Sequence, residues 1–371
     1  MYLGYLEWRQ ASYCYRRELG KLKTLELIKE RIKETPNGYL YFDEYMDLSL
    51  YSDQGYFNSG LVRSTKEGDF LTSSEVSEYF GKTIAKWIVN KSDSSVINIL
   101  ELGAGSGSLS KSIKDSTLDR ELNFHFIEKS DTAIKSLVDL FPESIVSKTT
   151  EESSLLELKD LIVIGNEILD NVPCSIAIID DGRWKEKAVR LIDEELEYCL
   201  VEPRKQVIYW LRSNFKEEKP DFEVEVQINA ETYIQDVLER FSPLAILLID
   251  YGYLKEDRAA KPYKSLLRTY KEHHIGPDPL LYPGETDITY DINFSSMNKA
   301  IDSSLYQKKI STQYEFLYEN GLNDYVEDLT RRRSKEEGLD LVKTNSDLLS
   351  IKTISDKSGL GSFYAIEATR K

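Results

Sequence analysis

The stretch VINILELGAGSGSL, residues 96–109, joins an apolar run to a glycine-rich turn. The run is short and rich in Ile, Leu and Val, so it predicts a buried strand over Val96–Leu102. The glycines at 103, 105 and 107 carry no Cβ, so the backbone here can pass close to a ligand. The helix expected after them begins with free N–H groups. A tight strand-to-helix turn needs similar glycines, so the loop by itself does not decide a function.

Three more short apolar runs follow this one, with helical stretches between them. Short buried strands that alternate with helices predict a parallel sheet with right-handed crossovers, which is an α/β fold. Near the C-terminus a Gly-x-Gly turn within 357–369 leads into a further alternating strand, FYAIEAT. The three runs are Phe124–Ile127, Leu161–Ile164 and Leu244–Ile249.

Two stretches interrupt this alternation and predict insertions. Residues 174–215 read as alternating strands with a turn at Asp180-Asp181-Gly182, which predicts an inserted β element. Residues 253–295 are rich in Pro, Gly and Tyr and predict an inserted loop region. We therefore expect an N-terminal helical and loop region over 1–92 and a core over 93–371 that carries both insertions.

The N-terminal region contains two helix signals. A helix is expected over Thr24–Lys33, and Pro36-Asn37-Gly38 should end it. Thr72 and Glu75 have the spacing of a capping box. The apolar helical stripe that should follow consists of Val76, Phe80, Ile84, Trp87 and Ile88.

The composition is acidic and poor in cysteine. The formal net charge is −16 over 371 residues, which disfavours nucleic acid as a partner and suits a cationic substrate or a basic protein. Solubility alone would also account for this charge. Cys14, Cys174 and Cys199 form no CxxC pair, so we expect no disulfide framework and no metal site. No run is apolar and long enough for a membrane span, and the N-terminus has no signal-peptide core.

The expected location follows from the same features. A reducing compartment fits the few cysteines, and we expect the cytoplasm of a bacterium. The mitochondrial matrix is the alternative, because Arg9, Arg16 and Arg17 suit a transit peptide, although Glu7 and Glu18 do not.

Two acids frame the glycine loop. Glu101 stands two residues before Gly103, and E-x-G-x-G-x-G is the pattern of class I S-adenosylmethionine methyltransferases rather than the GxGxxG of dinucleotide sites. Glu128 ends the next expected strand, where an acid can accept hydrogen bonds from both ribose hydroxyls of a nucleoside. An ordinary surface carboxylate is the other reading of Glu128.

A third group of polar residues follows the apolar run LIVI. Asn166, Glu167 and Asp170 lie just beyond a strand that reads as fully buried. In doubly wound sheets ligands bind beyond the carboxyl ends of the strands, near the reversal of strand order. Helix capping would explain one of these three residues but not all of them. We therefore expect the methyl group to be transferred at this place.

Taken together, these motifs resemble the MidA-type methyltransferases, also described as the complex I assembly factor 7 protein arginine methyltransferases of mitochondria and bacteria. The resemblance runs from about residue 25 to the end. Departures are Ser74 in place of a proline, Ser265-Leu266-Leu267 in place of Gly-Thr-Leu, and His274 in place of an arginine. The matching blocks are FDEYMDLSLYSDQGYF (42–57), GDFLTSSEVSEYFG (68–81), ELGAGSGSL (101–109), GNEILDNVP (165–173), IDYGY (249–253), YKEHH (270–274), LLYPGETDITYDINF (280–294), TQYEFLYENGL (312–322) and GLGSFYAIEAT (359–369).

The resemblance implies a class I methyltransferase fold, which is a Rossmann-like seven-stranded sheet with helices on both faces. It implies S-adenosyl-L-methionine as cofactor and a protein arginine as methyl acceptor, in a subunit of the 49-kDa type of complex I, and it allows a homodimer. Carboxylates can hold a guanidinium bidentately, so we assign this clamp to Glu167, with Asp170 as second carboxylate or support. Tyr56, Asp69 and His273 are expected at the mouth for the substrate. The expected cofactor residues are Glu101, Gly103, Ala104, Gly105, Glu128, Asn166, Phe70 and Thr72.

Other functions remain open at this point. A Rossmann dehydrogenase would need NAD, and both the glycine spacing and the NExxD block disfavour it. An assembly chaperone could keep this fold and its motifs with little catalysis. A methyltransferase for a different nitrogen or oxygen acceptor is a third alternative.

Overall fold

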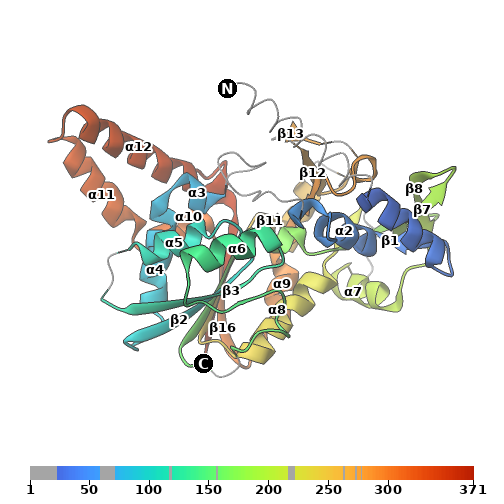
Figure 1. Cartoon of the computed structure of the whole chain (residues 1–371), viewed down its shortest axis with the longest axis horizontal. Helices are drawn as coiled ribbons and strands as arrows, with labels where there is room; N and C mark the ends of the chain where they lie inside the picture. Colours follow the sequence, from blue (N-terminus) through green and yellow to red (C-terminus); the bar gives the residue numbers. More distant parts are fainter. Residues whose placement is uncertain are drawn as a thin grey trace, which may run out of the picture. The chain divides into compact units, whose positions relative to one another are not determined.

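The computed structural model describes residues 23–58, 72–116, 119–155, 158–215, 222–261, 264–271, 274–276 and 278–371 (Figure 1). The chain forms two compact units. Unit 1 takes its described residues from Met1–Leu61, Asn171–Ala230 and Ala259–Asp291. Unit 2 takes them from Val62–Asp170, Glu231–Arg258 and Ile292–Lys371.

Unit 2 is built on a seven-stranded sheet with the order β16-β17-β10-β5-β2-β3-β4. The apolar runs expected as strands all lie in it. Six strands run in the same direction, whereas β17 is antiparallel to both of its neighbours, β10 and β16. The strands are β2 (Val96–Leu102), β3 (Glu121–Ile127), β4 (Val146–Ser147), β5 (Leu161–Asn166), β10 (Ala245–Asp250), β16 (Tyr306–Thr312) and β17 (Tyr364–Arg370).

The parallel sheet expected from the four apolar runs is confirmed, and the C-terminal strand β17 is the one that runs against them. Tyr364, the first residue of β17, pairs with Asp250, the last residue of β10. The chain thus enters β17 at the carboxyl edge of the parallel strands, so β17 has to run back against them. The sheet is mixed for this reason.

The strand order reverses next to the glycine loop. From β2 the chain moves outward to β3 and β4, whereas β5 and β10 lie on the other side of β2. In open α/β sheets the crevice for a ligand lies at this reversal, beyond the carboxyl ends of the strands. The carboxyl ends of β2 and β5 are therefore the place to look for a site.

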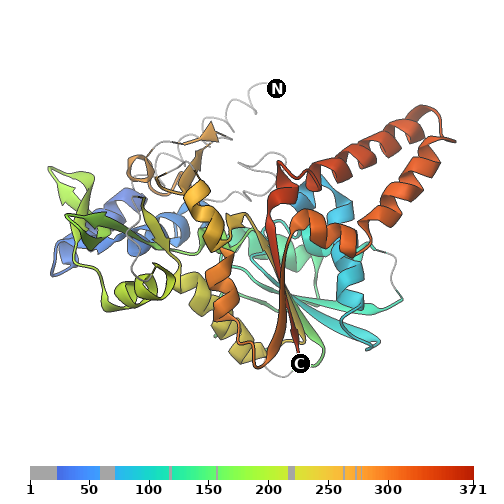
Figure 2. The same cartoon turned by 180° about the vertical axis from the view of Figure 1, so that it is seen from behind.

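Helices cover both faces of this sheet (Figures 1 and 2). One face packs against apolar residues of α4, α5, α6, α10, α11 and α12. Alternate strand residues such as Leu100, Val163 and Leu248 are buried on the other face, where α8 and α9 lie. The helices are α3 (Ser73–Val76), α4 (Glu78–Val89), α5 (Ser108–Lys114), α6 (Asp131–Leu140), α8 (Ile228–Phe241), α9 (Phe294–Ala300), α10 (Gln313–Glu319), α11 (Leu322–Arg333) and α12 (Gly338–Ile354).

The helix start predicted at Thr72 and Glu75 is confirmed. Glu75 accepts a hydrogen bond from the Thr72 backbone N–H at 3.3 Å, as a capping box requires. The apolar stripe is interrupted at Ser77, which caps α4, so Val76 belongs to α3. The other four stripe residues are buried in α4.

Unit 1 contains a five-stranded sheet in which β7 pairs with β1, β6 and β8, and β9 pairs with β6. A helix covers residues 23–34 and ends before Pro36, as expected. The predicted turn is also confirmed, because Asp181 and Gly182 have φ values of 46° and 72°, as in a two-residue hairpin turn. The elements are β1 (Tyr39–Tyr41), α2 (Phe42–Tyr51), η1 (Tyr56–Asn58), β6 (Ser175–Asp180), β7 (Arg183–Ile192), β8 (Glu195–Val201), α7 (Lys205–Phe215) and β9 (Val224–Val226).

The prediction of strands up to residue 215 is wrong at its end. Residues 205–215 form α7 instead. The buried side chains of this segment follow the spacing of a helix, which the alternating interpretation overlooked. They are Val207, Trp210, Leu211, Asn214 and Phe215.

The expected insertion at 253–295 contains short elements of both units. In unit 1, β12 (Leu267–Lys271) pairs with β13 (His274–Ile275) and β14 (Asp287–Tyr290), next to η4 (Pro279–Leu281). In unit 2, β11 (Gly252–Tyr253) pairs in parallel with β15 (Ile292–Asn293), and η3 (Lys255–Ala260) follows β11. Within the described ranges no helix could cross a membrane, and no group of His, Cys, Asp and Glu has the arrangement of a metal site.

Candidate functional site

The glycine loop follows β2, and Glu101 near the end of β2 supports it. This side chain is 3% exposed, and its carboxyl accepts a hydrogen bond from the Ser110 hydroxyl of α5. Burial raises the pKa of Glu101 to about 8, so the carboxyl is mostly protonated at neutral pH. Glu101 therefore ties the end of β2 to the helix that follows the loop.

The loop itself depends on left-handed backbone. Gly103 and Gly105 have φ values of 62° and 53°, which cost a residue with a Cβ free energy. The Gly105 N–H donates to Glu128 Oε2 at 2.9 Å, and the Ser130 N–H donates to Glu128 Oε1 at 2.8 Å. Burial raises the pKa of Glu128 above its ordinary range. The glycine loop and the acid after β3 thus meet at the carboxyl edge of the sheet.

The segment 72–75 links this loop to the end of β5. The Ser74 hydroxyl lies 2.8 Å from the Ser108 hydroxyl at the start of α5. Ser106 donates to Glu75 Oε1 at 3.3 Å, on the same segment. The Ser73 N–H donates to Glu167 Oε1 at 3.3 Å. One short segment therefore contacts both halves of the candidate site.

Glu167 is the acid at the centre of the candidate site. Its Oε1 also accepts a hydrogen bond from Asn166 Nδ2 at 3.1 Å, and Glu167 makes no ion pair within the described part of the chain. Burial, and next the charge of Asp170, raise its pKa to about 8. Its φ of 52° is unusual for a residue with a side chain, and such strain often marks functional sites.

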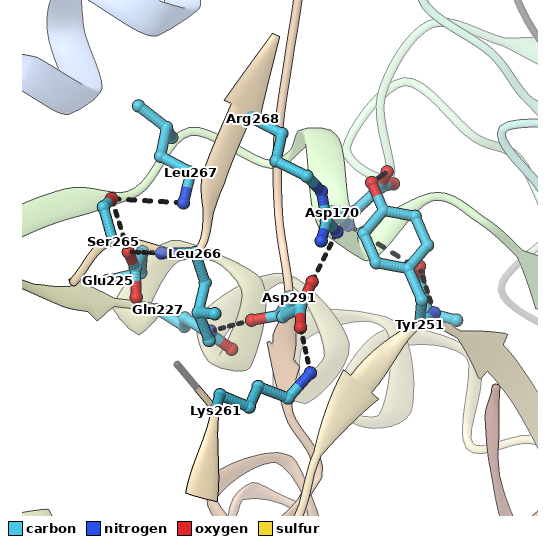
Figure 3. Close-up of polar contacts among 11 residues, drawn as sticks. Asp170, Glu225, Gln227, Tyr251, Lys261, Ser265, Leu266, Leu267, Arg268 and Asp291 are labelled. Atoms are coloured by element: carbon cyan, nitrogen blue, oxygen red, sulfur yellow. Dashed lines mark hydrogen bonds and ion pairs between the residues drawn. The ribbon is translucent and has the colours of Figure 1, made fainter. Parts of the chain in front are cut away.

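Two further acids lie beside it, at the ends of β5 and β10. Asp170 is 4% exposed and accepts a hydrogen bond from the Tyr251 hydroxyl (Figure 3). Asp250 is 0% exposed and accepts hydrogen bonds from the N–H groups of Leu169 at 2.9 Å and Asp170 at 3.3 Å. Burial and the charges of Asp170 and Glu167 raise the pKa of Asp250 well above its usual range.

Most of the site residues expected from the sequence thus lie together in unit 2. Tyr56 is fully buried in unit 1, in edge contact with the Phe57 ring. Phe70, Asp69 and His273 lie outside the described residues. The part that each of these residues plays stays a prediction.

Sequence reasoning missed Asp250 and Ser73 as members of this cluster. Asp250 ends a buried parallel strand, as Asn166 does, and the same rule about strand ends would have selected it. Ser73 contributes its backbone N–H, which any residue except proline could donate, so its identity carried no signal.

The strand order, with an antiparallel β17 between β10 and β16 and a glycine loop after β2, defines the class I methyltransferase fold. The chain belongs to the family described as "Putative S-adenosyl-L-methionine-dependent methyltransferase", which matches residues 83–310. The cofactor of this family is S-adenosyl-L-methionine.

Two named relatives are protein arginine methyltransferases. The chain is 25% identical over 301 residues to "Protein arginine methyltransferase NDUFAF7 homolog, mitochondrial" of Drosophila melanogaster, covering 71% of this chain and 67% of the relative. It is 24% identical over 362 residues to the NDUFAF7 protein of Xenopus laevis, covering 85% and 79%.

A solved structure supports the fold. It is a likely methyl transferase of Burkholderia thailandensis, of the COG1565 superfamily, bound to S-adenosyl-homocysteine. Its TM-score is 0.81 at 20% identity, over 95% of this chain and 93% of that one. The MidA-type resemblance expected from the motifs is confirmed by these comparisons.

The residues at the carboxyl edge fit this cofactor. The buried Asn166 Oδ1 accepts no hydrogen bond from any described residue, so it is available to a donor such as an ammonium group. The two Glu128 oxygens each hold one backbone N–H and can accept further hydrogen bonds, as from ribose hydroxyls.

Proposed function

We propose that this protein methylates an arginine side chain of a protein substrate. The names of the NDUFAF7 relatives support arginine as the acceptor. The observation that carries the proposal is the carboxyl of Glu167, which lies at the strand-order reversal and has no ion pair within the described residues. A carboxyl without a cation of its own can receive one from a substrate.

In this proposal Glu167 holds the acceptor guanidinium. A carboxylate binds two guanidinium N–H groups at once, which fixes the plane of the group and the direction of the attacking nitrogen. Asp170 supplies a second negative charge or supports Glu167. Orientation of this kind can account for about 7–11 kcal/mol of a barrier. Bound S-adenosyl-L-methionine supplies the methyl group from its sulfonium.

Cofactor binding is assigned to the glycine loop and its neighbours. Gly103, Ala104 and Gly105 would pass beneath the ligand, and Glu128 would accept the ribose hydroxyls. Asn166 would accept a donor of the amino-acid part through its Oδ1. Glu101 orients the loop through Ser110, and Thr72 with Phe70 would close the site.

The raised pKa of Glu167 couples substrate binding to protons. With a pKa of about 8, the carboxyl is mostly neutral at pH 7 in the free protein. A guanidinium beside it favours the ionised form, so its pKa falls on substrate binding. Binding of the cation should therefore release a proton from Glu167.

The test is methyl transfer from radiolabelled S-adenosyl-L-methionine. We expect label in methylarginine after hydrolysis of an acceptor protein, with the complex I subunit of 49-kDa type as first candidate. Glu167→Gln should lower kcat/KM by about 100-fold or more while S-adenosylhomocysteine binds nearly as before. Glu367→Gln is the matched control, because Glu367 lies on β17 and accepts from Trp87 Nε1 at 2.6 Å, outside the site.

Three outcomes would contradict the proposal. Label in another residue type would identify a different acceptor, and transfer at the wild-type rate by Glu167→Gln would remove the clamp. An assembly chaperone with little catalysis would bind S-adenosylhomocysteine without labelling any acceptor.

We further propose that the partner is a protein and not a nucleic acid. The proposed location is the bacterial cytoplasm or, as the names of the relatives suggest, the mitochondrion.

A further inference from the structure

Asp250 is bonded in an unusual way at the end of β10. Its side chain is 0% exposed, and its two oxygens accept three backbone N–H groups. Oδ2 accepts from Leu169 at 2.9 Å and from Asp170 at 3.3 Å, whereas Oδ1 accepts from Tyr251 at 2.9 Å. No Lys or Arg in the described ranges forms an ion pair with it.

These bonds fix the turn that leaves β5. The turn begins at Glu167, whose backbone is left-handed with φ 52°, and continues into η2 (Leu169–Asn171). The Glu167 N–H donates to the Ile249 carbonyl at 2.8 Å, next to Asp250 in β10. Both ends of the turn are therefore attached to the last two residues of the neighbouring strand.

Tyr251, the residue directly after β10, makes a further contact with the turn. The Tyr251 hydroxyl donates to Asp170 Oδ2 (Figure 3). The Tyr251 ring packs edge-on against Phe363 at 5.5 Å between centroids, which limits its movement. Asp250 thus acts on the main chain of the turn, and Tyr251 acts on its acidic side chain.

An amide in place of the Asp250 carboxyl could not accept all three hydrogen bonds. Asn has one acceptor oxygen and would direct its NH₂ group at an N–H donor, so at least one of the three bonds would be lost. Burial and the nearby acids also oppose ionisation of Asp250, which makes the position costly for a residue that served only packing.

We infer that Asp250 is a positioning residue, which holds the turn so that Glu167 and Asp170 face the acceptor together. The inference rests on the proposed function, because it is the methyl acceptor that the two acids would face. It adds to that function the residue that fixes the direction of the Glu167 and Asp170 carboxyl groups. Tyr251 shares the task through its bond to Asp170.

The experiment compares Asp250→Asn with Asp160→Asn in the full-length protein. Asp160 precedes β5 at its other end, has φ 50° and accepts from Ser92 at 3.1 Å, so it matches the change away from the site. Amide hydrogen exchange of residues 167–170 is measured without cofactor. Exchange at Leu169 and Asp170 should be about 10-fold faster in Asp250→Asn and unchanged in Asp160→Asn.

Kinetics then test the consequence. In Asp250→Asn kcat should fall about 10- to 100-fold, while the Kd for S-adenosylhomocysteine changes less than about 3-fold. If Asp250→Asn does not fold, Tyr251→Phe replaces it, and kcat should again fall with cofactor binding retained. Unchanged exchange in Asp250→Asn, or faster exchange with wild-type kcat, would overturn the inference.

The proposed function and the inference about Asp250 can be refuted separately. A wild-type protein that methylates no arginine would refute the proposed function, whatever Asp250 does. Exchange in the same variants would still show whether Asp250 holds the turn, because that measurement needs no acceptor.

Discussion

Two buried acids of unit 1, Glu186 and Asp291, are stabilised differently from the acids of the candidate site in unit 2. In unit 1 the Arg204 guanidinium contacts Glu186 Oε1 at 2.6 Å and Asp43 Oδ1 at 2.7 Å, and it also donates to Ser175. The Arg204 Cζ atom lies 4.0 Å from the centre of the Tyr41 ring. The fully buried Glu186 is thus paired with a fixed cation of the same unit.

A second acid of unit 1 follows the same rule. Asp291 is 3% exposed and forms ion pairs with Lys261 and Arg268 (Figure 3). Gln227 donates to its backbone carbonyl at 2.9 Å. The Asp291 carboxyl is therefore paired with cations of its own unit.

In unit 2 the acids of the candidate site are held by N–H groups and hydroxyls instead. Glu101, Glu167 and Asp250 form no ion pair within the described residues, and burial raises the pKa of each. Paired buried charges chiefly serve structure, whereas buried acids with perturbed pKa values cluster at functional sites. The difference is consistent with the proposal that Glu167 receives a cation from a substrate.

The largest expected effect is the loss of cofactor binding in Gly105→Val. The branched Cβ would strain a backbone with φ 53° and fill space next to Glu128. Calorimetry should show S-adenosylhomocysteine binding weakened by about 100-fold or more. The control is Gly338→Val, which has φ 62° but no atom within 4 Å of an added Cβ, and which should bind normally.

The next effect should appear in unit 1, as a loss of stability. Arg204→Met leaves Glu186 buried without its cation, so the free energy of unfolding should fall by about 3 kcal/mol. Urea unfolding followed through Trp184 and Trp210 measures it. Lys185→Met removes an exposed pair with Glu202 and should cost less than about 1 kcal/mol. Equal costs for both would contradict the view that unit 1 depends on its buried pair.

A smaller loss is expected for Asp170→Asn. If Asp170 supports Glu167, the variant should lower kcat/KM about 10-fold, less than Glu167→Gln does. Steady-state rates with one acceptor protein compare the two variants directly. A larger loss in Asp170→Asn would exchange the assigned roles.

The last effect concerns the dependence of stability on pH. The pKa of Glu101 is about 8 in the folded protein, well above its usual 4.5, so the unfolded chain releases this proton first as pH rises. The contribution of Glu101 to stability should therefore be full below about pH 4.5 and be lost as pH rises to about 8. Glu101→Gln should remove this contribution, so stability should decline less steeply between about pH 4.5 and pH 8 when unfolding is measured at several pH values. An unchanged slope would contradict the raised pKa.

Much of the fold could be predicted because its signals are local. The strands around 96–102 and 161–166 are visible as short apolar runs. The glycine motif around Gly103 indicated the edge of the sheet at which a ligand is expected. The antiparallel β17 could not be read locally, because its direction depends on where α12 returns to the sheet. Helix α7 was missed because polar residues separate its buried positions, so it was mistaken for alternating strands.

The candidate site was predictable residue by residue but not as a network. Glu167 and Asp170 are visible as polar residues after a buried strand. What holds them comes from distant positions, namely the Ser73 N–H and the side chain of Asp250. Such contacts join residues far apart in the chain, so no pattern within one segment could show them.

The pH dependence of methyl transfer tests the central claim most directly. The arginine acceptor stays charged across this range, so a change of rate reports on the enzyme. With the Glu167 pKa near 8, kcat/KM of the wild type should rise with pH and level off above about pH 8. Glu167→Gln should be slow and nearly independent of pH. The same rise in both proteins would show that Glu167 is not the group that receives the cation.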